Sequence, residues 1–200
     1  MENEGVLSRN GQDIAMQQNH TIAPTPCRDP APLQGALSRR PQYALTVGES
    51  ASGYGKTTAV REYLDTLGQY TLWYTCYGEP PVKTWNGICR TLSHIDSEAA
   101  RILERIGVPG DDNLSDIADC LRAVHCDQES WLVIDNFQYM QDSAPALLVE
   151  ALSARSSPLL HIVLITQSIG YRKNRTVQND RVYCIENGDF FFRPEDIDVY

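Results

Sequence analysis

The stretch Tyr43–Thr58, YALTVGESASGYGKTT, decides the fold. It begins with apolar residues typical of a strand, continues with small residues, and is followed by apolar residues at helical spacing. A strand, a glycine-bearing loop and a helix in that order are what a phosphate-binding P-loop requires. Glycine lets the backbone turn so that N–H groups converge on an anion, and the helix adds the positive end of its dipole. The stretch therefore predicts a P-loop.

The residue types in this loop fit the same prediction. Lys56 supplies a cation for the β- and γ-phosphates, and Thr57 supplies a hydroxyl ligand for Mg²⁺. Ser50 stands where the usual pattern has its first glycine, which is tolerable if that residue needs no positive φ angle. We expect the following residues to hold the nucleotide: Ser50, Ala51, Ser52, Gly53, Tyr54, Gly55, Lys56, Thr57 and Thr58.

A second polar position follows the apolar run 131–134. Asp135 ends this run, which lacks polar alternation, as expected of a strand buried on both faces. Its carboxylate can hold the water shell of Mg²⁺ opposite Thr57. Asn136 comes next, where many P-loop ATPases carry an acid that orients or deprotonates the attacking water. An amide accepts no proton at neutral pH, so we expect nucleotide binding with slow or absent hydrolysis.

A third polar position is Thr166–Gln167, at the end of the apolar run 159–165. We expect this strand to lie between the strand of the P-loop and the strand of Asp135. A polar side chain at its end can contact the γ-phosphate, although ordinary strand termination explains it equally well. The candidate catalytic residues are Lys56, Asp135, Asn136 and Gln167.

Strand and helix patterns alternate along the chain. Strands are expected at 42–48, 71–77, 131–136, 159–165 and 181–186, and helices at 55–68, 82–94 and 97–106, after Asn113 as N-cap, and from Ser143 and Pro145 onward. The alternation predicts an α/β fold, a three-layer P-loop NTPase with a mainly parallel sheet of about five strands. The nucleotide-binding domain is expected at 41–189, after a flexible or draped segment at 1–40.

Composition excludes several classes of function. The 42% hydrophobic content is ordinary for a soluble domain, and the net charge of −9 disfavours direct nucleic-acid binding. No apolar run is long enough to span a membrane, and no signal peptide is evident. The six scattered cysteines indicate reduced thiols and a cytoplasmic protein.

Two weaker candidates have ordinary explanations. Cys120, His125 and Cys126 do not have the spacing of a zinc site, and buried thiols at a helix end explain them better. The basic loop containing Arg172, Lys173, Arg175 and Arg181 could supply an arginine finger, but a solvated loop is the default.

The chain resembles the STAND class of P-loop ATPase domains, and within it the LuxR-type activators related to the maltose regulator. The resemblance rests on these stretches: Glu49–Thr58, Leu72–Tyr77, Trp131–Phe137, His161–Gly170 and Phe190–Asp196. It implies an ATP/ADP switch in which ADP holds a closed monomer, whereas ATP and an inducer favour self-association. It also implies that 190–200 begins a truncated helical lid. Asn136 and Gln167 depart from the family, which usually has an acid and often an arginine there.

We therefore expect a regulatory switch domain of a signal-transduction or transcription-control protein. It should bind ATP or ADP with Mg²⁺ and associate with itself or with other domains of a larger regulator. Two alternatives stay open at this point. The first is an active ATPase or small-molecule kinase that uses the same loop, and the second is an interaction module that needs no nucleotide.

Overall fold

A five-stranded parallel sheet forms the middle layer of the fold. The computed structural model describes residues 45–143, 149, 151–153, 157–167 and 182–185. The strand order is β2-β3-β4-β1-β5, and every neighbouring pair is parallel. The strands are β1 (Leu45–Glu49), β2 (Tyr70–Thr75), β3 (Ser130–Asp135), β4 (Leu160–Thr166) and β5 (Val182–Ile185). This order confirms the α/β prediction, including the place of β4 between β1 and β3.

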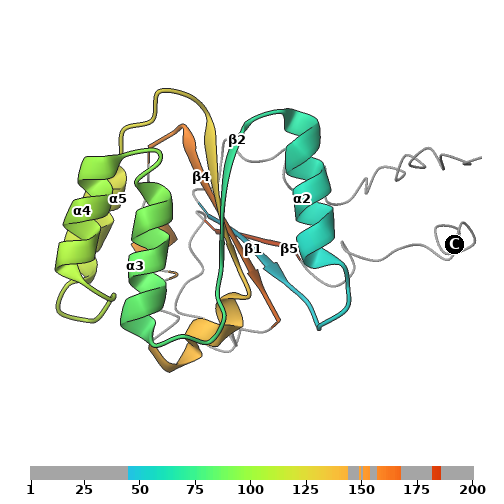
Figure 1. Ribbon diagram of the computed structural model, residues 1–200, viewed down its shortest axis with the longest axis horizontal. Coiled ribbons are helices and arrows are strands. Elements are labelled where there is room, and N and C mark those ends of the chain that lie inside the picture. The colour runs from blue at the N-terminus through green and yellow to red at the C-terminus, as the bar shows by residue number, and fades with distance from the viewer. Residues whose placement is uncertain (1–44, 144–148, 150, 154–156, 168–181, 186–200) are drawn as a thin grey trace, which may run out of the picture.

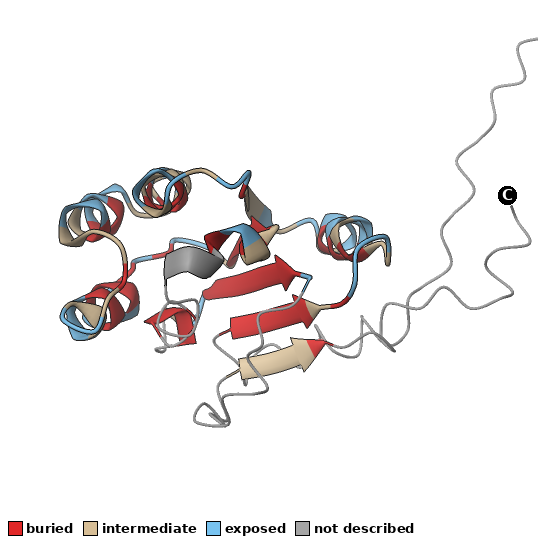
Figure 2. Ribbon diagram, turned by 90° about the horizontal axis from the view of Figure 1, so that it is seen from below, coloured by how far each residue is buried: buried red, intermediate tan, exposed pale blue. Residues whose placement is uncertain are grey.

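Burial follows the apolar pattern of the strands. Every residue of β3 and β4 is buried, whereas β2 at one edge is half-buried or exposed along its length. Figure 2 shows that the central strands are buried, whereas the outward sides of the helices are exposed. Because every neighbouring pair of strands is parallel, the carboxyl ends of the strands share one edge of the sheet. The loops that follow the strands are thereby brought together.

Helices cover both faces of the sheet. The helix α2 (Lys56–Leu67) lies on one face, and α3 (Pro81–Leu92), α4 (Ser97–Ile106) and α5 (Leu114–Arg122) lie on the other, as Figure 1 shows. On the first face, Val60 and Leu64 of α2 pack in one cluster with Val133 of β3. The larger cluster on the second face joins α3, α4 and α5 to the sheet.

Asp96 fixes the relative position of α4 and α5. One carboxylate oxygen caps α4 by accepting hydrogen bonds from the backbone N–H groups of Glu98 at 3.0 Å and Ala99 at 2.9 Å. The other oxygen accepts from the N–H of His125 at 2.9 Å, just after α5. Burial alone would raise the pKa of Asp96, but these backbone donors hold it below its ordinary value.

Asn113 holds the N-cap position of α5, as predicted, but its side chain makes no capping hydrogen bond. The side-chain Oδ1 accepts from Gly110 N at 2.7 Å, and Nδ2 donates to Val108 O at 3.0 Å. The Asn113 carboxamide thus provides hydrogen-bond partners for backbone groups of the preceding loop and not for the first turn of α5. The helix expected from Ser143 and Pro145 falls largely outside the described residues, and the 3₁₀ helix η2 (Phe137–Ser143) that precedes it was not predicted.

The expected segments 1–40 and 190–200 and the basic loop lie outside the described residues. In the part of the chain that the structure does describe, no helix has the length and apolar character needed to cross a membrane.

Trp85 joins α3 to α4, so its truncation tests the helical layer. The side chain is 1% exposed, and Nε1 donates to the carbonyl of Leu103 at 3.1 Å. Trp85→Ala should lower the free energy of unfolding by about 3–5 kcal/mol, measured by urea denaturation. Val82→Ala, at an exposed position of the same helix, should change it by less than about 0.5 kcal/mol. Equal effects of the two substitutions would contradict this packing.

Candidate functional site

The loop between β1 and α2 turns through two glycines. Gly53 has φ 86° and Gly55 has φ 69°, and both angles lie in the left-handed region that glycine adopts without steric cost. Ser50 does not have a positive φ angle, which explains why serine can replace the usual first glycine. Its N–H instead donates to the carbonyl of Thr166 at 3.3 Å and joins the loop to β4.

Lys56, the first residue of α2, is folded back across this loop. Its Nζ donates to the carbonyls of Ser50 at 2.7 Å and Ala51 at 2.8 Å, and the residue is 8% exposed. Burial lowers the pKa of the ammonium, and the Asp135 carboxylate opposes that shift. In these contacts the cation faces only carbonyl dipoles, so an anion in the loop would be a stronger partner.

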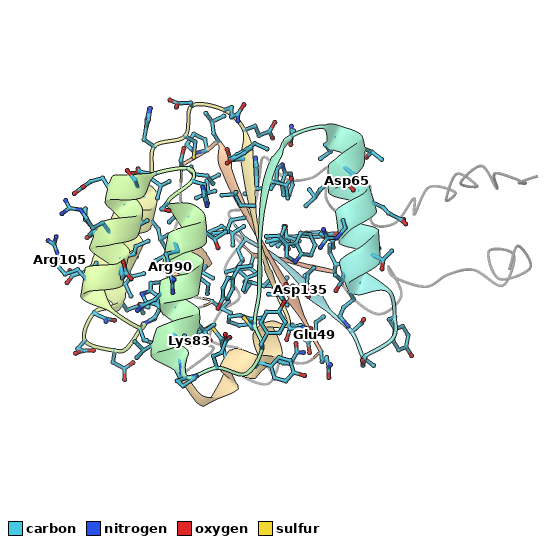
Figure 3. All side chains as sticks on the ribbon, in the orientation of Figure 1. Glu49, Asp65, Lys83, Arg90, Arg105 and Asp135 are labelled. Atoms are coloured by element: carbon cyan, nitrogen blue, oxygen red, sulfur yellow. The ribbon has the colours of Figure 1, made fainter. Side chains whose placement is uncertain are left out.

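Thr57 and Asp135 meet directly although 78 positions separate them. The hydroxyl Oγ1 lies 3.2 Å from Oδ1 and 3.1 Å from Oδ2 of the carboxylate. Asp135 ends β3 at the same sheet edge as Glu49, the last residue of β1 (Figure 3). A hydroxyl and a carboxylate are oxygen ligands of the kind that Mg²⁺ takes alongside waters and phosphates. The donor set therefore fits that ion.

Asn136 changes the direction of the chain immediately after Asp135. Its φ angle is 56°, and it is the one residue other than glycine with a positive φ in the described part of the chain. Asparagine tolerates this region better than most residues. Its N–H donates to Oδ1 of Asp135 at 2.8 Å, and its carbonyl accepts from the N–H of Tyr139 at 3.0 Å. These contacts begin the η2 turn.

Thr166 and Gln167 end the neighbouring strand. The Thr166 side chain is buried, with the residue 1% exposed, yet no described residue offers its hydroxyl a hydrogen-bond partner. A buried polar group without a partner is costly and calls for an explanation. The N–H of Gln167 donates to Oε1 of Gln138 at 3.2 Å, which connects the end of β4 to η2.

One cleft of about 130 Å³ collects most of the predicted residues. Its lining comprises Ser52, Gly53, Gly55, Lys56, Thr57, Thr58, Asp135, Asn136, Gln138, Ile165, Thr166 and Gln167. Ser50, Ala51 and Tyr54, although predicted to bind, are not part of this lining. Ser50 and Ala51 act instead through their carbonyls, which hold Lys56.

Sequence reasoning missed Gln138 as a residue of the cleft. The side chain lies between the ends of β3 and β4, because η2 turns back over the sheet edge. The only signal in the sequence is a second amide two residues after Asn136. That pattern does not distinguish a residue that lines the cleft from one exposed on a turn.

The described cysteines lie outside the lining of this cleft. Cys76, Cys89, Cys120 and Cys126 are free thiols, and burial raises the pKa of the first two to about 12. The described residues contain no group of three histidine, cysteine or acidic side chains that could hold a metal ion. The site is therefore one of hydroxyl, amide, ammonium and a single carboxylate.

Comparisons with known proteins agree with this geometry. A family model described as AAA domain matches residues 40–173. No curated protein matches the sequence. Among solved structures, a Walker-type ATPase of Pyrococcus abyssi is 16% identical with TM-score 0.48, and covers 84% of this chain and 53% of its own. Drosophila ORC, in a structure bound to DNA, is 18% identical with TM-score 0.50, and the match covers 80% of this chain and 42% of the ORC chain. The chain thus spans about half the length of these structures, and the likeness concerns the fold.

Thr166→Val tests whether the buried hydroxyl lacks a partner. Removing an unsatisfied hydroxyl at nearly constant shape should leave the free energy of unfolding unchanged or raise it by about 1 kcal/mol in urea denaturation. Thr84→Val is the matched control, because that buried hydroxyl donates to the carbonyl of Glu79 at 3.4 Å. The control should lose about 1 kcal/mol. A comparable loss in Thr166→Val would mean that its hydroxyl is satisfied.

Proposed function

The chain belongs to the AAA domain family, and on that premise we propose that the cleft binds ATP or ADP together with Mg²⁺. The fold is that of a P-loop NTPase, with the glycine loop at the junction of a central strand and a helix. The observation that carries the proposal is the direct contact of Thr57 with Asp135 beside Lys56. A phosphate cradle and a metal-binding pair then share one cleft.

Each group has a separate part in binding. The N–H groups at the start of α2 and the turned glycines bind phosphate oxygens. Lys56 exchanges the carbonyls of Ser50 and Ala51 for phosphate, which is a stronger charge-assisted partner. Thr57 and Asp135 hold Mg²⁺, directly or through its waters. When bound, the ion neutralises charge on the β- and γ-phosphates.

Weak hydrolysis is the second part of the proposal. Among the described residues, Asp135 is the one acid in the lining of the cleft, and it already contacts Thr57 and the N–H of Asn136. Glu79 does not line the cleft, and it pairs with Lys83 at 3.4 Å. The cleft therefore offers amides and a hydroxyl where a general base would otherwise stand. Such a base accelerates a reaction typically by about 10²–10⁴-fold.

The regulatory role follows from tight binding with slow turnover. A domain that holds ATP or ADP for long periods is suited to a switch, as in the STAND and LuxR-type regulators that the sequence resembles. The matched structures are about twice as long, which supports partner domains in a larger regulator. Exposed Tyr77, Val82 and Tyr139 are candidates for such contacts or for self-association. We further propose a cytoplasmic protein that does not itself bind nucleic acid, consistent with free cysteines and a net charge of −9.

Lys56→Ala tests nucleotide binding itself. Loss of the ammonium should weaken ATP binding at least tenfold, about 1.4 kcal/mol, in calorimetry with Mg²⁺. Lys83→Ala removes an equal charge from an exposed side chain outside the cleft and should leave affinity unchanged. If Lys56→Ala binds ATP as the wild type does, the loop does not hold phosphate and the nucleotide-independent module is favoured.

Asn136→Asp tests the explanation of slow turnover. In single-turnover assays the wild type should hydrolyse ATP slowly, and the aspartate should accelerate the step because it restores a proton acceptor. Asn136→Ala, which removes the amide without adding an acid, is the matched control and should give no acceleration. A wild-type rate of tens per second, within the range of true kinases, would instead favour an active enzyme.

A further inference from the structure

We propose that Gln138 is a positioning residue that gives the cleft its preference for a triphosphate over a diphosphate. The inference rests on the proposed function, because it concerns how the same cleft distinguishes ATP from ADP. It assigns a role to a side chain that neither the P-loop nor the metal pair includes.

The contacts of Gln138 connect two strand ends. Its Oε1 accepts the N–H of Gln167 at 3.2 Å, after β4, and its Nε2 donates to Oδ1 of Asn136 at 3.4 Å, after β3. The backbone N–H of Gln167 requires an oxygen as its partner, so the carboxamide has one orientation. All three residues line the cleft. Gln138 therefore holds two neighbouring parts of the lining at a fixed spacing.

These contacts determine what Asn136 presents. Because Oδ1 accepts from Gln138, the group that Asn136 can offer to an anion is its Nδ2 amide, a donor. The nearby strand end offers the Thr166 hydroxyl, which is buried, lines the cleft and has no partner among the described residues. Asn136 and Thr166 therefore place two neutral donor groups in the cleft that Asp135 also lines.

The position of these donors indicates which phosphate they bind. An ion held by Thr57 and Asp135 would neutralise charge on the β- and γ-phosphates. Asn136 directly follows Asp135, and Thr166 ends the strand between β3 and β1. Both donors therefore lie on the metal side of the cleft, where a third phosphate adds oxygens that a diphosphate lacks. ATP should satisfy them, whereas ADP should leave them unused.

A purely structural role for Gln138 makes a different prediction. Two hydrogen bonds between strand ends contribute about 1 kcal/mol each to stability, but a loss of stability alone would affect ATP and ADP binding equally. A positioning role instead changes the ratio of the two affinities. The ratio is therefore the discriminating measurement.

The test is calorimetry with Mg²⁺ and either ADP or a non-hydrolysable ATP analogue. Gln138→Ala and Gln138→Met should each weaken binding of the triphosphate about three- to tenfold, because a misplaced donor loses most of a hydrogen bond to a charged group. Both should bind ADP within about twofold of the wild type. Methionine nearly keeps the volume of glutamine while removing its amide. Tyr139→Ala, at an exposed neighbour outside the lining, should leave both affinities unchanged.

Three outcomes would overturn the inference. In the first, Gln138→Met keeps the wild-type ratio, which shows that volume and not hydrogen bonding matters. In the second, both variants lose ATP and ADP binding equally while thermal denaturation shows lower stability, as a structural role predicts. In the third, the wild type binds the two nucleotides equally well. Failure of the proposed function is distinguishable, because Lys56→Ala would then change no affinity, whereas failure of this inference alone leaves the effect of Lys56→Ala intact.

Discussion

The contact between Thr57 and Asp135 is the constraint on which the rest of the structure depends. It requires that β1 and β3 run in the same direction and end at the same sheet edge, with β4 inserted between them. It also requires a loop that turns through Gly53 and Gly55, so that α2 begins close to the end of β1 and Thr57 faces Asp135. The buried strands and the helices on both faces hold this geometry in place.

Polar groups confined to this edge give the cleft its chemical character. Lys56 is the one cation and Asp135 the one carboxylate in the described lining, and the remaining polar side chains are hydroxyls and amides. Under the proposed function, such a lining would hold a polyphosphate and its metal ion, and its one carboxylate already contacts Thr57 and the N–H of Asn136. The left-handed Asn136 is costly for a stable fold, as is the Thr166 hydroxyl, which has no hydrogen-bond partner among the described residues. Both residues line the cleft in which a ligand would bind.

Much of the fold could be predicted from local pattern. The continuous apolar runs before Asp135 and Thr166 indicated strands buried on both faces, and the glycine loop fixed where α2 starts. The side-chain contacts of Asn113 and the turn η2 were not predicted, because the same residue types suit several local conformations. Asn113 satisfies its own preceding loop, and η2 follows from the left-handed conformation of Asn136. Asparagine is compatible with both conformations but specifies neither.

The candidate site was also predictable only in part. The residues predicted to bind phosphate stand in one motif, and the structure brings Lys56 and Thr57 of this motif together with Asp135 in one cleft. Gln138 enters the site only through tertiary contacts, which sequence spacing does not encode. By contrast, the tolerance of serine at position 50 depends only on a φ angle that is not positive, and Ser50 has no positive φ.

The most direct measurement of the central claim is a double-mutant cycle on the metal pair. ATP affinity would be measured with and without Mg²⁺ for the wild type, Thr57→Val, Asp135→Asn and the double variant. If the two side chains form one metal site, each single variant should lose most of the gain in affinity that Mg²⁺ gives, and the double variant should lose little more. A gain from Mg²⁺ that survives in both single variants would contradict the account.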